Sequence, residues 1–142
     1  MEKKEIKRVF RDYLPTTRAY KLAVKKAERI EADAQSLKAV VITGMPHGSG
    51  VSDPVSNAVC KLLDAAEKVK AAAEKYADQI RQYEYLVSLV SDPQAIEIIR
   101  LRWEQDIDFD YIPAKIHASR RTMFYHYGKA IEEIYAKTQT LH

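Results

Sequence analysis

The chain has 142 residues, a formal net charge of +3, and 46% hydrophobic and 30% charged residues. This balance is ordinary for a soluble, ordered protein, and no apolar run approaches the roughly 20 residues that a transmembrane helix needs, which argues against membrane insertion. The opening MEKKEIKRVFRDYL lacks the uncharged core of a secretion signal, and the single cysteine, Cys60, cannot form an internal disulfide. We therefore expect a cytoplasmic protein in which Cys60 behaves as a small buried hydrophobe.

The positive charge is concentrated near the amino terminus. Residues 1–38 hold 11 Lys or Arg against 6 Asp or Glu, whereas the rest of the chain is close to neutral. A small net charge does not by itself identify a nucleic-acid-binding protein. The plain interpretation is a solvated basic face, and the alternative is added phosphate contact or long-range steering of an anionic partner.

Proline and glycine predict the first helix boundaries. Pro15 is expected to end a short helix over residues 2–13, because the residue before a proline disfavours helical backbone. Thr16 or Thr17 then provides a hydroxyl that caps the next helix. Three of the four glycines gather in ITGMPHGSGVS, residues 42–52, which we expect to be a loop.

The triplet Ser-Asp-Pro occurs twice in the chain. In each copy the aspartate can accept hydrogen bonds from free helix amides, while the proline takes the first helical position. Each copy therefore predicts a helix start, and the two copies are Ser52-Asp53-Pro54 and Ser91-Asp92-Pro93.

Apolar residues recur in alternating steps of three and four along two long predicted helices. In the first, the set is Tyr20, Ala23, Ala27, Ile30, Ala34, Leu37 and Val41. In the second, from Asp53 to about Val90, the set is Val55, Val59, Leu62, Ala66, Val69, Ala73, Tyr76, Ile80, Tyr83, Val87 and Val90. This heptad seam predicts a long antiparallel coiled-coil hairpin that folds back through the glycine-rich loop.

The second long helix outruns the first, so its last turns need another cover. Ile6, Phe10 and Tyr13 can supply it from the same chain. A second copy of the protein can add to that cover, and both arrangements remain open. Tyr85 falls off the seam and is expected to be exposed.

The carboxy-terminal third predicts a compact unit of three short helices, at about 93–103, 110–117 and 119–137. Each helix carries apolar residues on one face, as expected for a small shared core. These residues are Ile96, Ile99 and Trp103 in the first helix, Ile112 and Ile116 in the second, and Met123, Ala130 and Ile134 in the third.

The last two of these helices carry the most specific chemical pattern. Between Tyr111 and Ile131 there is no acidic residue, although acids crowd both sides, and the four fixed cations there are Lys115, Arg120, Arg121 and Lys129. Two short amphipathic helices around a tight turn are typical of a helix-turn-helix that binds DNA. An ordinary solvated surface helix is the alternative.

The predicted second helix of this motif has donors at its start. Ser119 is placed to cap it, and its first turn holds Arg120, Arg121 and Thr122. Arginine can bind guanine in a bidentate manner, and Thr122 or an exposed aromatic can contact a thymine methyl group.

The residues that follow continue this pattern. Met123 is expected to turn inward, and Phe124 and Tyr125 to turn outward. Lys115 and Lys129 flank the row and are expected to contact phosphate, which sets position rather than sequence preference.

These segments resemble a known family. AIEIIRLRW at 95–103, followed by DFDYIPAKIHASRRTMFYHYGKAIEEI at 108–134, looks like region 4 of bacterial sigma factors, a helix-turn-helix that reads promoter DNA. The loop MPHGSGVSDPVSNAV at 45–59, ahead of such a unit, looks like small phage-encoded proteins with a sigma-70-region-4-like helix-turn-helix. The resemblance implies a transcriptional regulator of phage or prophage genes, similar to phage late-gene regulators.

The chain departs from the family pattern at two positions. Pro113 stands where the family carries a small helix former, which implies a helix that starts near Asp110 and keeps the proline in its first turn. His126 stands in a place usually given to an aliphatic residue. It implies either different packing of the recognition helix or a hydrogen bond inside the small core.

Other constellations do not indicate a metal site or catalysis. The four histidines, His47, His117, His126 and His142, show no metal-ligand spacing with Cys60. The glycine-rich loop lacks the GK[ST] ending of a phosphate cradle. His47 and Ser49 could be a base and a nucleophile, but no third group is placed to orient them. We expect no metal, no cofactor and no enzymatic activity.

The sequence therefore predicts an all-α protein, with a coiled-coil stem over residues 1–91 and a helix-turn-helix domain over residues 92–142. The expected function is sequence-specific binding of double-stranded DNA by a homodimeric transcription regulator, with the helix at 119–137 in the major groove. The alternatives are a module that binds RNA polymerase through stem and head, and a small DNA-packaging subunit similar to those of terminases.

Overall fold

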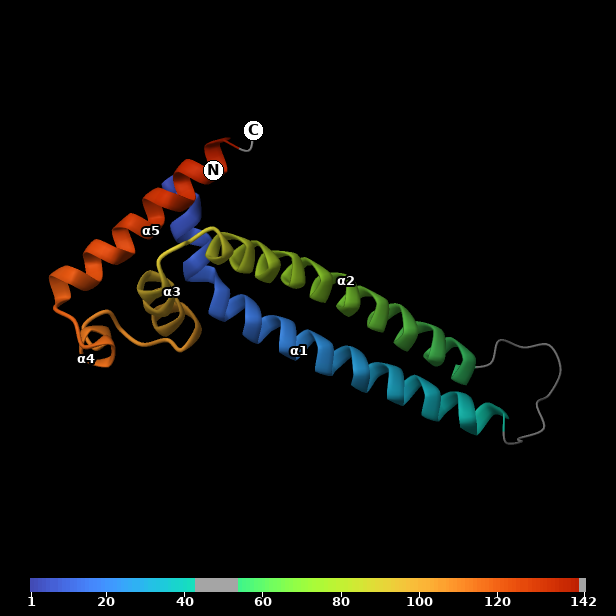
Figure 1. The fold of residues 1–142 in the computed structure, drawn as a ribbon. Coiled ribbons are helices and arrows are strands. Elements are labelled where there is room, and N and C mark those ends of the chain that lie inside the picture. Colours follow the sequence, from blue (N-terminus) through green and yellow to red (C-terminus); the bar gives the residue numbers. More distant parts are fainter. Residues whose placement is uncertain (43–53, 141–142) are drawn as a thin grey trace. The chain divides into compact units, whose positions relative to one another are not determined.

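The computed structural model describes residues 1–42 and 54–140, in which the regular elements are all helices (Figure 1). In chain order these are α1 (Lys3–Ile42), α2 (Pro54–Ser88), α3 (Pro93–Ile99), the π-helical turn η1 (Arg100–Glu104), α4 (Ile112–Ile116) and α5 (Arg120–Thr140). The absence of strands over these residues confirms the predicted all-α fold. No helix in this part of the chain is long and apolar enough to cross a membrane.

Some predictions lie outside the described residues. The expected loop at 42–52 is one of them, apart from Ile42, which belongs to α1. The expected cap Asp53 and the residues His47, Ser49 and His142 are others.

Pro15 does not end a helix, so the prediction of a short first helix over residues 2–13 is wrong. α1 continues through Pro15, which is exposed and lacks the amide that would bond the Arg11 carbonyl. The Thr17 Oγ1 donates to the Tyr13 carbonyl at 2.9 Å and so does not cap a new helix. Apolar residues before Pro15, including Phe10, are buried in the core, and burial of each contributes about 1.5–3 kcal/mol, comparable to the proline penalty of about 3 kcal/mol.

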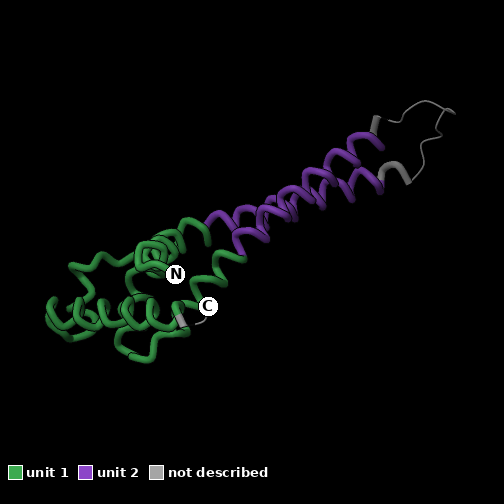
Figure 2. The backbone as a smooth tube through the Cα atoms, turned by 90° about the horizontal axis from the view of Figure 1, so that it is seen from above, with its two compact units in different colours: residues 1–17, 78–142 green, residues 18–77 purple. Residues whose placement is uncertain are grey.

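The described chain divides into two compact units, one of residues 18–77 and one of residues 1–17 with 78–142 (Figure 2). The expected division placed all of residues 1–91 in a stem. In the structure, residues 1–17 and 78–91 pack with the carboxy-terminal helices instead, because their apolar faces share one core with α3 and α5.

The unit of residues 18–77 is a helical hairpin in which α1 and α2 run side by side in opposite directions (Figure 1). The predicted seam is confirmed here: its buried members are Ala27, Ala34, Val59, Ala66 and Ala73. The alanines let the two backbones approach closely, and the Lys70 ammonium pairs with the Glu31 carboxylate across the seam.

Cys60 lies outside this seam, and the prediction that it is buried is wrong. Its side chain is exposed. The reason is its position directly after Val59, because successive helical residues point about 100° apart and only Val59 faces α1.

The second unit is built around the fully buried ring of Tyr83. The Phe10 ring meets it edge-on with 5.6 Å between centroids, and the Tyr13 ring stacks on it at 4.0 Å. The start of α1 therefore covers the last turns of α2, as both predicted arrangements required. Burial raises the pKa of the Tyr83 hydroxyl well above its usual value.

The same core includes residues that were expected in a separate three-helix core. Ile99, Ala130 and Ile134 pack with α1 and α2 residues, whereas Ile112 and Met123 form a smaller cluster with Ile98. The expected core is wrong in this respect. Neighbouring residues Ile98 and Ile99 point to different sides of α3, so that α3 lies between two apolar clusters.

Candidate nucleic-acid interface

The chain between α4 and α5 makes a tight turn at His117. This residue ends α4 in the left-handed conformation, with φ 53° and ψ 44°, and the Ala118 amide donates to the Pro113 carbonyl at 3.1 Å. Histidine reaches this backbone region more readily than most residues. Pro113 lies in the first turn of α4, as its sequence position implied, although the helix starts at Ile112 rather than near Asp110.

Ser119 caps α5, as predicted. Its Oγ accepts from the Thr122 amide at 3.1 Å and donates to the Thr122 Oγ1 at 2.9 Å. The Ser119 carbonyl accepts from the Met123 amide at 2.9 Å, which begins the regular helix. The first turn of α5 thus has a defined geometry, with the positive end of the helix dipole at this surface.

Met123 sets the rotation of α5 about its own axis. Its side chain is fully buried against Ile98 and Ile112, so the residues beside it must face away. Tyr125 is 59% exposed and Phe124 38% exposed, as predicted for both.

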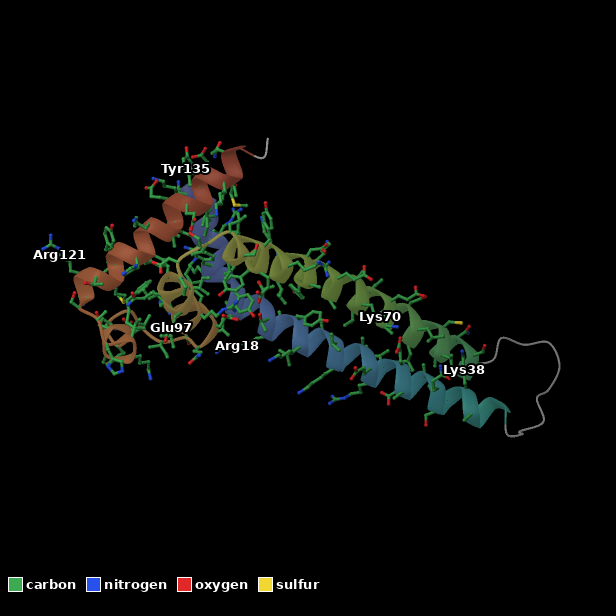
Figure 3. All side chains as sticks on the ribbon, in the orientation of Figure 1. Arg18, Lys38, Lys70, Glu97, Arg121 and Tyr135 are labelled. Atoms are coloured by element: carbon green, nitrogen blue, oxygen red, sulfur yellow. The ribbon has the colours of Figure 1, made fainter. Side chains whose placement is uncertain are left out.

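Three of the predicted residues form one row on the exposed face of α5. Arg121, Tyr125 and Lys129 follow one another at intervals of four residues, which places them one above the other on a helix. The Lys129 Nζ lies 5.2 Å from the centroid of the Tyr125 ring, and the Arg121 side chain extends away from the helix (Figure 3). We call Arg121, Tyr125 and Lys129 the outward row. Thr122, also exposed, flanks it.

Arg120 does not belong to this row. Its guanidinium pairs with the Asp110 carboxylate and lies over the Phe124 ring, 5.4 Å from the centroid. Asp110 is thus a residue of the site that sequence reasoning missed. It is ten positions from Arg120, across the turn at His117, and no helical spacing links the two. Of the two arginines predicted to contact bases, Arg120 is therefore held by Asp110, whereas Arg121 has no such partner among the described residues.

Lys115 lies in the last turn of α4 and is exposed. Within the described part of the chain, no hydrogen bond, ion pair or ring contact joins it to the outward row. It therefore stands as a separate positive charge on the first helix of the motif.

His126 anchors α5 to the start of α3. Its Nδ1 lies 2.6 Å from Oδ2 of Asp92, whose Oδ1 accepts from the Gln94 amide at 3.1 Å and caps α3 as predicted. Desolvation raises the pKa of Asp92, but the hydrogen bonds from His126 and Gln94 outweigh it and leave the pKa below its usual value. His126 thus bonds at a helix end, and not inside the small core.

A second anchor lies beside the first. The amide and hydroxyl of Ser91 donate to the two carboxylate oxygens of Glu133, at 2.8 and 2.7 Å. The Ser91 hydrogen bonds hold the pKa of Glu133 below its usual value. Neither anchor was expected from sequence, apart from the capping role of Asp92. Together the two anchors hold α5 against the chain segment of Ser91 and Asp92, and so set the position of the outward row.

Among the described residues, no group of three or more His, Cys, Asp or Glu side chains could hold a metal ion. None of the protein-family models, curated proteins or solved structures with which the chain was compared matches it. What this surface can bind therefore follows from its own side chains.

Proposed function

We propose that this protein is a sequence-specific, double-stranded DNA-binding transcriptional regulator, encoded by a phage or prophage and acting in the cytoplasm of a bacterial host. The observation that carries the proposal is the outward row. Arg121, Tyr125 and Lys129 stand on one face of a 21-residue helix whose start is capped by Ser119 and which is anchored through His126 and Glu133. No acidic residue occurs from Tyr111 to Ile131.

The chemistry of this row fits the major groove of B-DNA. The groove is about 12 Å wide and admits one helix, with base edges facing the helix start. A free Arg121 guanidinium can donate two hydrogen bonds to guanine, and Thr122 or Tyr125 can contact a thymine methyl group. Lys129 and Lys115 lie farther along or on α4, where contact with phosphate is the natural role for a cation.

The tethered arginine has a different part in this proposal. Arg120 is held by Asp110 and by the Phe124 ring, so binding a phosphate or base through Arg120 requires exchange of the Asp110 partner. Arg121 is therefore the principal base-contacting residue, and Arg120 holds the surface in place through its contacts with Asp110 and Phe124.

The order of elements also supports the resemblance to sigma region 4. α3 and η1 precede a short α4, the turn at His117 and the longer α5, as in a helix-turn-helix with a preceding helix (Figure 1). The resemblance implies that the target is promoter or operator DNA. The side chains of the outward row supply the groups that would contact it.

Selection from a random duplex library with the full chain tests the proposal. The expected result is enrichment of one sequence motif, bound with an affinity that falls as salt rises. Arg121→Ala should weaken binding to the selected site by about 1–3 kcal/mol, and should relax the preference at one base pair.

Arg18→Ala is the matched control, because it removes one exposed arginine from α1, far from α5 in sequence, and should leave affinity unchanged. Failure to enrich any motif, or an affinity that responds neither to salt nor to Arg121→Ala, would rule out sequence-specific DNA binding. Retention on RNA polymerase in that case would favour the protein-binding alternative.

A further inference from the structure

The hairpin of residues 18–77 carries two grooves between α1 and α2 that differ in charge. The first, which we call the lysine groove, has apolar walls and two cations. Leu22 on its α1 side is 69% exposed. The residues that matter for its chemistry are Leu22, Val69, Ala72 and Tyr76, with Lys26 and Lys68.

The second groove, which we call the glutamate groove, is also apolar between its charges. Its chemistry depends on Tyr20, Val24 and Ala27, with Glu28, Glu31 and Glu74. The Lys70 side chain, labelled in Figure 3, also lines it. Its ammonium pairs with the Glu31 carboxylate. Glu28 and Glu74 are left without an ion pair among the described residues, as Lys26 and Lys68 are in the lysine groove.

The two grooves lie on opposite sides of the buried seam. Leu22 and Val24 are two residues apart on α1 and so point about 200° apart, with the seam residue Ala27 between the two directions. Both grooves lie at the same level of the hairpin, since each is formed by residues between 19 and 31 of α1 and between 68 and 77 of α2.

We propose that the lysine groove of one copy packs against the glutamate groove of a second copy. Such a contact covers Leu22 and Tyr76 of one hairpin with the apolar wall of the other, and brings Lys26 and Lys68 near unpaired carboxylates. Contact between two like grooves would instead face lysine with lysine or glutamate with glutamate, which costs free energy. Charge complementarity therefore selects unlike faces.

An interface between unlike faces has a consequence for assembly. Each copy has one groove of each kind. When a copy is added, it uses one of its grooves and leaves the other uncovered, so further copies can bind unless the assembly closes. Because the grooves share one level, neighbouring hairpins pack side by side without a shift along their length. This arrangement extends to three or more copies, as an open row or as a closed ring, in place of the dimer expected from the sequence.

Charge reversal with reciprocal rescue tests the interface on the full chain. Light scattering after gel filtration should give the wild type a mass of at least three copies. Reversal of the lysine groove, K26E with K68E, should give a monomer, and so should reversal of the glutamate groove, E28K with E74K. An equimolar mixture of the two variants should reassemble, because the reversed lysine groove of one variant complements the reversed glutamate groove of the other, and the two unreversed grooves also complement each other.

A matched control reverses two exposed lysines outside both grooves, K38E with K61E, and should keep the wild-type mass. Circular dichroism verifies that each variant retains its helices. A wild type that is monomeric, or a two-fold dimer that survives both reversals, overturns the proposal. Folded variants that do not reassemble when mixed overturn it as well. None of these outcomes depends on whether α5 binds DNA.

Discussion

His126 on α5 meets Asp92 at the start of α3, with 2.6 Å between Nδ1 and Oδ2, although the two residues are 34 positions apart. The same carboxylate caps α3 through the Gln94 amide. One aspartate thus fixes a helix start and the helix that carries the outward row. A change in its charge should therefore alter the free energy of unfolding of this unit.

We expect Asp92→Asn to lower the free energy of unfolding at neutral pH by less than about 1 kcal/mol, since asparagine still caps a helix but offers no charge to His126. The pKa of Asp92 is depressed in the folded state, so its contribution is present above the unfolded pKa of about 4 and is lost as pH falls through the folded pKa. Urea unfolding from pH 7 to pH 2 measures this difference.

The difference between wild type and Asp92→Asn should shrink as the pH drops below about 4. Asp64→Asn, at an exposed position of α2, is the control and should show no such trend. A difference that stays constant over the whole range would mean that the charge of Asp92 contributes nothing.

Gly128 occupies an exposed position inside α5, and a Cβ built there meets no atom within 4 Å. Gly128→Ala should therefore raise the free energy of unfolding by about 0.5–1 kcal/mol, because alanine loses less backbone entropy in a helix. Thermal or denaturant unfolding measures it. A loss of stability would mean that α5 is strained at this position.

Features that depend on a few neighbouring residues could be predicted from the sequence. The alternation of threes and fours predicted the hairpin seam, and Ser119 and Asp92 were recognised as caps because capping acts within three residues. Burial of Met123 and exposure of Tyr125 follow from helical period alone.

Features that depend on how distant segments meet could not be predicted. The rule that proline ends a helix is local, and at Pro15 the packing of the flanking apolar residues outweighs it. The pairs Arg120–Asp110 and His126–Asp92 follow from the left-handed turn at His117 and from the angle between α3 and α5. No spacing in the sequence encodes either.

Ser119 offers a way to separate stability from binding. Ser119→Ala removes the cap and should cost about 1 kcal/mol of unfolding free energy. Ser119→Asp keeps a capping oxygen and should preserve stability, but its negative charge at the start of α5 should weaken DNA binding. Denaturant unfolding and duplex affinity, measured on both variants, give the comparison. Equal affinities for Ser119→Asp and wild type would argue that phosphate does not approach this turn.

Asp110 holds Arg120 and places a negative charge beside the proposed DNA-binding surface. Both side chains of this pair are more than half exposed, so Asp110→Asn should change stability by less than about 1 kcal/mol. It should strengthen DNA binding and steepen the dependence of affinity on salt, because Arg120 is released to a phosphate and a repulsive carboxylate is lost. Titration of a labelled duplex at several salt concentrations measures both. Asp64→Asn, which adds the same charge on α2, controls for net charge, and an equal gain in both variants would show that Asp110 has no special influence on Arg120.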